Sequence, residues 1–68
     1  MPYPTIDDLP PSVRRNLPEH AQQIYREAFN HAWQGYAADA RREERAHRIA
    51  WAAVKKRYVK EGGVWQPR

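Results

Sequence analysis

The side chains that could bind a metal ion are three histidines, His20, His31 and His47. His20 and His31 share one face of a helix, but eleven residues separate them by ~16 Å along its axis. A structural metal site needs three or more convergent ligands, and no such cluster is apparent. Glu27 precedes His31 by four residues, and Glu43 precedes His47 by the same interval. We interpret both pairs as weak surface contacts between neighbouring helical turns, and we predict no metal site and no cofactor.

Residue types for catalysis are equally sparse. The chain has no cysteine, which excludes disulfides, thiolate metal ligands and cysteine nucleophiles. Ser12 is its one serine, and Asp7 and Asp8 are adjacent near the chain start, where they are typical of capping or solvated residues. Gly62 and Gly63 alone do not make a phosphate-binding loop. We therefore predict no catalytic residues and a protein that is not an enzyme.

The length and composition predict the scaffold. A chain of 68 residues, 41% hydrophobic and 29% charged, suits one small soluble domain over residues 1–68 with a thin core. Its longest apolar run, residues 49–54, is far shorter than the ~20 residues of a membrane-spanning helix. The start of the chain lacks the basic and apolar regions of a signal peptide, so we expect a cytoplasmic protein.

Prolines and glycines divide the chain into elements. No proline occurs between Pro18 and Gly62, so this middle region is free to be helical. A short helix should begin with Pro11 at its first position and end at Leu17, which precedes a proline. Its apolar side would carry Leu9, Val13 and Leu17.

A second helix should begin at Pro18, because apolar residues then follow the three-and-four spacing of a buried stripe. That stripe contains Ala21, Ile24, Tyr25, Ala28, Phe29, Ala32, Trp33 and Tyr36. A third helix, ending at Gly62 with Lys60 in its last turn, would have a similar stripe. Its members are Ala46, Ile49, Ala50, Ala53 and Val54.

The join between these two helices is open to two interpretations. One continuous helix from residue 18 to residue 60 fits the apolar pattern as well. We favour two helices, because Gly35 weakens the end of the second and Asp39 could cap the third. Residues 41–45 are also all charged. Folding back would bury the two stripes against each other, whereas a single rod would leave its stripe exposed.

The chain ends could add a small antiparallel ribbon, with residues 3–5 paired to residues 64–66. The predicted fold class is therefore mainly all-α, a three-helix domain with a small terminal β-ribbon. Trp33 belongs to the apolar stripe and should lie in the core. Trp51 lies on the flank of its helix, where it could pack on the ribbon or on Trp65, or be exposed for a partner.

The charges are unevenly distributed. Residues 1–34 have a net charge of −1 and residues 35–68 a net charge of +5. At about 100° per residue, five basic residues fall on one face of the third helix, opposite its apolar stripe. This face could bind an acidic partner such as a nucleic acid, an acidic protein or anionic lipid headgroups, or it could be an ordinary solvated face with Glu44 neutralising Arg48. The candidate partner-binding residues are Arg41, Arg45, Arg48, Lys55 and Lys56.

Two long blocks of sequence resemble the ChaB family. Residues 20–36 have the pattern HAQxIYxxAFNxAWxxY, and residues 46–58 have the pattern AHxxAWAAVKxxY. The opening Met1-Pro-Tyr3 and the late Trp65 are also similar to the family. The likeness covers nearly the whole chain. It departs between Tyr36 and Glu44, a segment that is shorter and less acidic here, and this departure bears on partner recognition.

The resemblance implies three helices with a small antiparallel sheet, packed somewhat like part of a cyclin-box domain. It also implies a regulator of cation transport that acts with a calcium–proton or sodium–proton antiporter. From it we expect a small non-enzymatic monomer that binds a protein partner, the cytosolic face of such an antiporter. The alternatives are a nucleic-acid-binding module that uses the basic face of the third helix, and a helical dimer that buries Trp51 and Val59.

Overall fold

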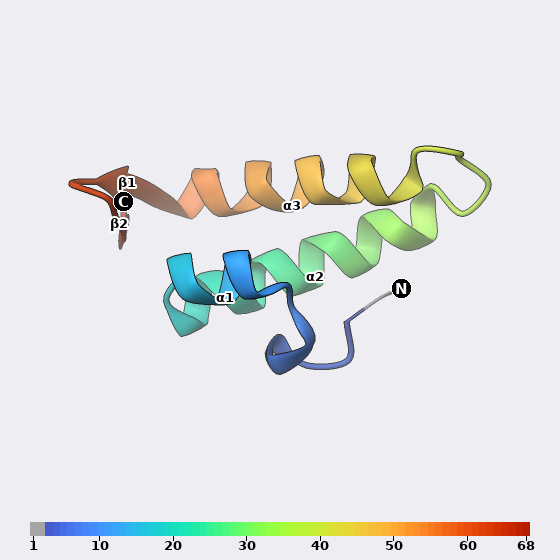
Figure 1. Cartoon of the computed structure of the whole chain (residues 1–68). Helices are drawn as coiled ribbons and strands as arrows, with labels where there is room; N and C mark the ends of the chain where they lie inside the picture. Colours follow the sequence, from blue (N-terminus) through green and yellow to red (C-terminus); the bar gives the residue numbers. More distant parts are fainter. Residues whose placement is uncertain (1–2) are drawn as a thin grey trace.

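The computed structural model describes residues 3–68, so Met1 and Pro2 of the family-like opening lie outside the described residues. A 3₁₀ turn, η1 (Ile6–Asp8), precedes the short helix α1 (Pro11–Asn16). Two long helices follow, α2 (Glu19–Gly35) and α3 (Arg42–Arg57), and the chain ends in strands β1 (Tyr58–Glu61) and β2 (Val64–Pro67). In Figure 1, α2 and α3 run in opposite directions and a loop joins them at one end of the molecule, while the hairpin lies at the other end.

The predicted helix starts are confirmed. Pro11 occupies the first position of α1, and Leu17 ends it with extended backbone before Pro18. Pro18 itself precedes the first residue of α2 as its N-cap. Asp8 accepts hydrogen bonds at Oδ2 from the Thr5 backbone N–H (3.1 Å) and hydroxyl (2.8 Å), so this aspartate caps η1 as expected.

The prediction of two separate long helices is also confirmed. The loop from residue 36 to residue 41 reverses the chain, and Asp39 accepts a 2.7 Å hydrogen bond from the Arg41 backbone N–H at the start of α3. This bond closes a turn in the loop, whereas Arg41 occupies the N-cap position of α3 without a side-chain cap hydrogen bond, so the predicted capping of α3 by Asp39 is wrong.

The core lies between α2 and α3, with the short N-terminal elements on one side. Four residues of the predicted α2 stripe are fully buried and the other four pack partly buried around them. Trp33 is one of the partly buried residues, with its ring stacked on Phe29 at 5.8 Å. The buried residues are Leu9, Val13, Leu17, Ala21, Tyr25, Phe29, Ala32, Ala46, Ala50, Val54 and Tyr58.

One residue that the apolar spacing placed in the core is exposed in the structure. Ile49 is 37% exposed, although its spacing put it in the apolar stripe of the third helix. The buried side of α3 follows Ala46, Ala50 and Val54, one residue every four. Helix α2 packs along this narrow line of small side chains, so the helix flank that carries Ile49 remains outside the contact.

The predicted fold class, three helices with a small terminal antiparallel ribbon, is confirmed. The predicted end of the third helix and the predicted pairing partners in the ribbon are wrong. Helix α3 ends at Arg57, and Lys60 lies in β1 instead of a last helical turn. β1 pairs with β2 in antiparallel register from Tyr58↔Pro67 to Glu61↔Val64, and residues 3–5 form no strand. The reason lies in Gly62 and Gly63, whose φ values of +58° and +81° make the two-residue turn that β-hairpins favour. The same glycines that could stop a helix therefore close a hairpin.

The N-terminal segment is instead attached to α2. Asn30 accepts a 2.8 Å hydrogen bond from the Tyr3 backbone N–H and donates a 2.9 Å bond to the Tyr3 carbonyl. The Tyr3 ring lies 4.7 Å from that of Phe29. The bonding groups of the Tyr3 backbone are thus used by a side chain, which explains why this segment does not pair as a strand.

Candidate partner-binding surface

All five predicted partner-binding residues are exposed. They lie on α3 or at its N-cap, on the side opposite the buried Ala46, Ala50 and Val54. Helical spacing places Ala52, also exposed, near the centre of this side. We call this side, with Arg41, Arg45, Arg48, Ala52, Lys55 and Lys56, the outer face of α3.

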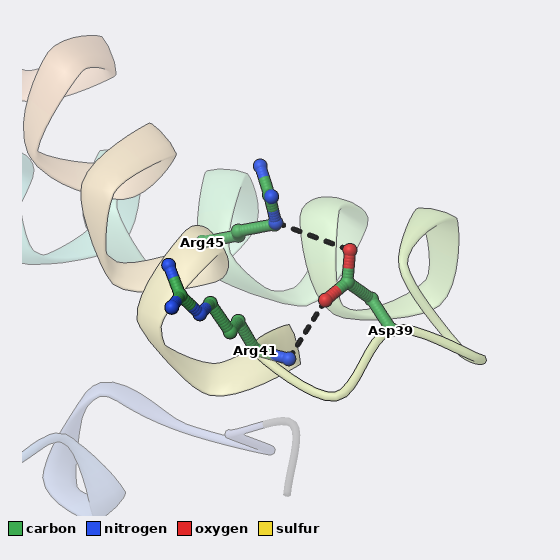
Figure 2. Close-up of polar contacts among 3 residues, drawn as sticks. All are labelled: Asp39, Arg41 and Arg45. Atoms are coloured by element: carbon green, nitrogen blue, oxygen red, sulfur yellow. Dashed lines mark hydrogen bonds and ion pairs between the residues drawn. The ribbon is translucent and has the colours of Figure 1, made fainter.

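The loop between the long helices neutralises one end of the outer face. Arg45 Nε lies 3.1 Å from Asp39 Oδ2, and its guanidinium carbon lies 5.8 Å from the centre of the Tyr36 ring. Figure 2 shows Asp39 between the Arg45 side chain and the Arg41 backbone, while the Arg41 guanidinium points away from Asp39. The Arg45 side chain is thus held by Asp39, whereas the Arg41 guanidinium is free of Asp39 and could contact a partner.

The middle and the far end of the outer face have freer charges. Glu44, which the sequence suggested as a partner of Arg48, forms no ion pair within residues 3–68. Lys55 and Lys56 diverge, since Lys56 lines a groove between α2 and α3 together with His20 and Glu27. Lys55 lines a different hollow, beside the hairpin. The five basic residues therefore form an extended surface and not one compact site.

Arg42, which the charge pattern did not single out, has a structural role. Its Nε donates a 2.7 Å hydrogen bond to the Trp33 carbonyl, and its guanidinium lies 3.9 Å from the centre of the Trp33 ring. A guanidinium in this position is attracted by the electron density of the ring. Arg42 therefore joins the start of α3 to the end of α2 and does not belong to the outer face.

The histidines lie apart, and their contacts differ from the surface pairs that the sequence suggested. His20 Nδ1 lies 2.9 Å from the Tyr58 hydroxyl, and His31 is exposed. His47 is partly buried. Its Nδ1 forms a hydrogen bond with the Tyr25 hydroxyl, and its ring centre lies 4.7 Å from that of Phe29. His47 is therefore not the surface residue that the sequence suggested, although the Glu43 carboxylate lies near enough to affect its pKa. Within residues 3–68, no three or more histidines and acidic residues are grouped so as to hold a metal ion.

The buried surroundings of His47 control its charge. Burial lowers the pKa of His47 from 6.5, and the nearby Glu43 carboxylate opposes this change. Burial also raises the pKa of the Tyr25 hydroxyl, so this hydroxyl stays protonated and can donate a hydrogen bond to Nδ1 of a neutral His47. The neutral histidine is the form that the folded protein favours.

The pKa change at His47 predicts a pH dependence of stability. The unfolded chain takes up a proton at His47 near pH 6.5, whereas the folded chain does so only at a lower pH, so the unfolded state binds more protons in between. The free energy of unfolding should therefore fall as the pH drops below 6.5, and it should level off below the folded pKa. Urea unfolding followed by circular dichroism between about pH 7.5 and pH 5 would measure this loss.

The matched control is His47→Gln, which retains His20 and His31 but cannot titrate at position 47. Its unfolding free energy should change less over the same pH range. Equal pH dependence in the two proteins would contradict the assignment to His47.

The sequence analysis missed the gathering of residues beside the hairpin. Lys60, Trp65 and Arg68 meet Lys55 there, and Trp51 packs on Trp65 with ring centres 5.8 Å apart. The packing of Trp51 on Trp65 was among the predicted alternatives and is confirmed. The available signal for the hairpin was the Gly62-Gly63 pair between residues with high strand preference.

Comparison with known proteins places the chain in context. The family model ChaB matches residues 9–68. Proteins of Escherichia coli (strain K12) and Shigella flexneri, each named "Putative cation transport regulator ChaB", are 58% identical to this chain. Each alignment covers 88% of this chain and 87% of the relative. A solved structure, described as "NMR solution structure of the putative cation transport regulator ChaB", superimposes with a TM-score of 0.86 at 51% identity, covering 98% of this chain and 99% of that one.

Helix length and hydropathy bear on whether a segment could cross a membrane. No helix that the structure describes in residues 3–68 is long and apolar enough for this.

Proposed function

This chain belongs to the ChaB family, and we propose on that basis that it is a small non-enzymatic regulator of cation transport that binds a protein partner. The observation that carries the proposal is the 58% identity, over most of both chains, to proteins named as cation transport regulators. Regulation by binding requires an accessible surface, and the outer face of α3 supplies exposed positive charge. We further propose a cytoplasmic location and, as the partner, the cytosolic side of a calcium–proton or sodium–proton antiporter.

The outer face of α3 favours an acidic, helical segment of the partner. Ala52 is small and exposed between Arg48 and Lys56, so another backbone could approach closely there. Ile49 lies one turn from Ala53 and is 37% exposed, which adds apolar surface at the flank of the charges. Charged groups of this kind direct association and orientation more than they add affinity.

The test compares two charge-reversal variants that change the net charge equally. Arg48→Glu with Lys56→Glu alters the outer face, and Arg14→Glu with Arg15→Glu alters exposed residues of α1. We expect the first variant to bind the purified antiporter about tenfold more weakly, because opposite charges at the contact become like charges. The second should bind as the native protein does. Binding is measured by titration with antiporter in lipid nanodiscs, after circular dichroism has shown that each variant is folded.

Two outcomes would count against the proposal. The first is that the native protein neither binds the antiporter nor changes its rate of ion transport. The second is that both variants lose binding equally. A parallel titration with short duplex DNA at low and high salt tests the nucleic-acid alternative, since phosphate contacts give a steep dependence on salt.

A further inference from the structure

The net positive charge of the chain is confined to its C-terminal end. Residues 1–54 contain seven basic and seven acidic residues, so they are neutral at pH 7. Residues 55–68 contain five basic residues and one acidic residue, Glu61, so they hold the whole net charge of +4. The structure places these residues in the last turn of α3 and the hairpin, at one end of the molecule (Figure 1).

The basic residues at this end surround aromatic side chains. A hollow of about 310 Å³ beside the hairpin is lined by Lys55, Tyr58, Val59, Lys60, Trp65 and Arg68. Its lining residues include three basic side chains and no acidic side chain. Arg68 is fixed there, since its Nη1 donates a 2.8 Å hydrogen bond to the Lys55 carbonyl and its backbone N–H donates a 2.9 Å bond to the Arg57 carbonyl. Arg68 is thus held against the end of α3, and the hollow has a basic rim.

The same end exposes apolar side chains. Val59 is 37% exposed and Val64 is 57% exposed, the largest exposure among the large hydrophobic residues described. Trp65 is partly buried, with one side on Trp51 and its remaining surface at the hollow. Val64 adjoins the Gly62-Gly63 turn at the outer end of the hairpin and stands opposite Glu61 in the antiparallel register. Because side chains alternate along a strand, Val59 and Val64 lie on one face of the hairpin and Lys60 and Trp65 on the other, so a planar surface would meet both sets only at this outer end.

We propose that this end of the molecule docks on an anionic lipid bilayer. Lysine and arginine residues near a membrane surface are attracted by anionic headgroups, tryptophan prefers the headgroup region, and exposed valines gain by entering the boundary with the acyl chains. A nucleic-acid backbone would contact the basic side chains but would gain nothing from the exposed valines. Basic, aromatic and exposed apolar side chains at one end of the molecule therefore favour a lipid surface. We call this set the hairpin surface, and it consists of Lys55, Val59, Lys60, Val64, Trp65 and Arg68.

This inference goes beyond the proposed protein partner, because vesicles that contain no protein can test it. The measurement is cosedimentation of the full chain with vesicles of equal parts phosphatidylglycerol and phosphatidylcholine, and with vesicles of phosphatidylcholine alone. We expect binding to the anionic vesicles only, with affinity that falls as the salt concentration rises.

Variants of the hairpin surface give the sharper test. Each lysine near an anionic membrane contributes roughly fivefold in affinity, so Lys55→Gln with Lys60→Gln should weaken vesicle binding about 25-fold. The matched control, Arg14→Gln with Arg15→Gln, removes the same charge from α1 and should bind nearly as the native protein does. Val64→Ser, which keeps all charges, should weaken binding roughly threefold to fourfold.

Three outcomes would overturn the proposal, provided that circular dichroism shows each variant to be folded. They are no binding to anionic vesicles, equal binding to neutral vesicles, and equal loss in the two charge variants. Binding of the native chain to duplex DNA but not to vesicles would assign the hairpin surface to nucleic acid instead. Neither lysine of this test is altered in the antiporter experiment with Arg48→Glu and Lys56→Glu, so each proposal can fail without the other.

Discussion

Replacing Phe29 with alanine is expected to lower the free energy of unfolding by about 3–5 kcal/mol, the usual cost of removing a buried phenyl ring. Phe29 is only 1% exposed. Its ring lies 4.7 Å from that of Tyr3, 4.7 Å from that of His47 and 5.8 Å from that of Trp33. It therefore joins the N-terminal segment, α2 and α3 at one point.

A loss of this size matters in so small a protein. Domains have roughly 0.05–0.15 kcal/mol of stability per residue, which gives about 3–10 kcal/mol for this chain. The Phe29→Ala variant should therefore lose a large part of its stability and unfold at a much lower temperature than the native protein, as circular dichroism during heating would show. Phe29→Leu keeps most of the buried apolar volume and should remain folded. A loss below about 1 kcal/mol for the alanine variant would show that the ring is not central to the core.

Enlarging Ala50 is expected to have the second-largest effect. Ala50 is fully buried on α3 and lies between Ala46 and Val54 on the side that faces α2. A leucine there must separate the helices or adopt a strained side-chain conformation, and overpacking of this kind costs about 1–3 kcal/mol. Urea unfolding of Ala50→Leu would measure the loss as a lower midpoint concentration.

The control for this prediction lies half a turn away on the same helix. Ala52→Leu makes the same chemical change at an exposed position of the outer face, where the change in stability should stay within about 0.5 kcal/mol. If the two variants were equally stable, the close approach of α2 and α3 along the alanine line would be wrong.

The helical part of the fold could be read from the sequence because its signals are local. Proline fixes the starts of α1 and α2 whatever surrounds them. The apolar spacing of α2 predicted every residue that the helix turns toward the core. For α3 the same method placed Ile49 inside, because spacing gives the direction of a stripe but not the width of the contact that covers it. That width depends on the small side chains by which α2 and α3 meet.

The partner-binding surface likewise has features that the sequence could predict and features that it could not. The sequence placed five cations on one side of α3, since helical geometry alone decides which residues share a side. Only the tertiary structure showed that Asp39 and Tyr36 engage Arg45, and that Lys55 and Lys56 line different hollows. These contacts join residues from different elements or from a loop, so no periodicity within one helix could predict them.

The sequence by itself therefore determined the helical regions, the mainly helical class, the family resemblance and the excess of positive charge, and it favoured a break between the two long helices without excluding one continuous helix. Local backbone preferences and residue spacing control all of these. The tertiary structure alone decided that His47 is buried against Tyr25 and that the Tyr3 backbone is held by Asn30. Those contacts depend on which distant segments meet. The free energy of burying the segments together selects the contacts, and local backbone preference has less influence.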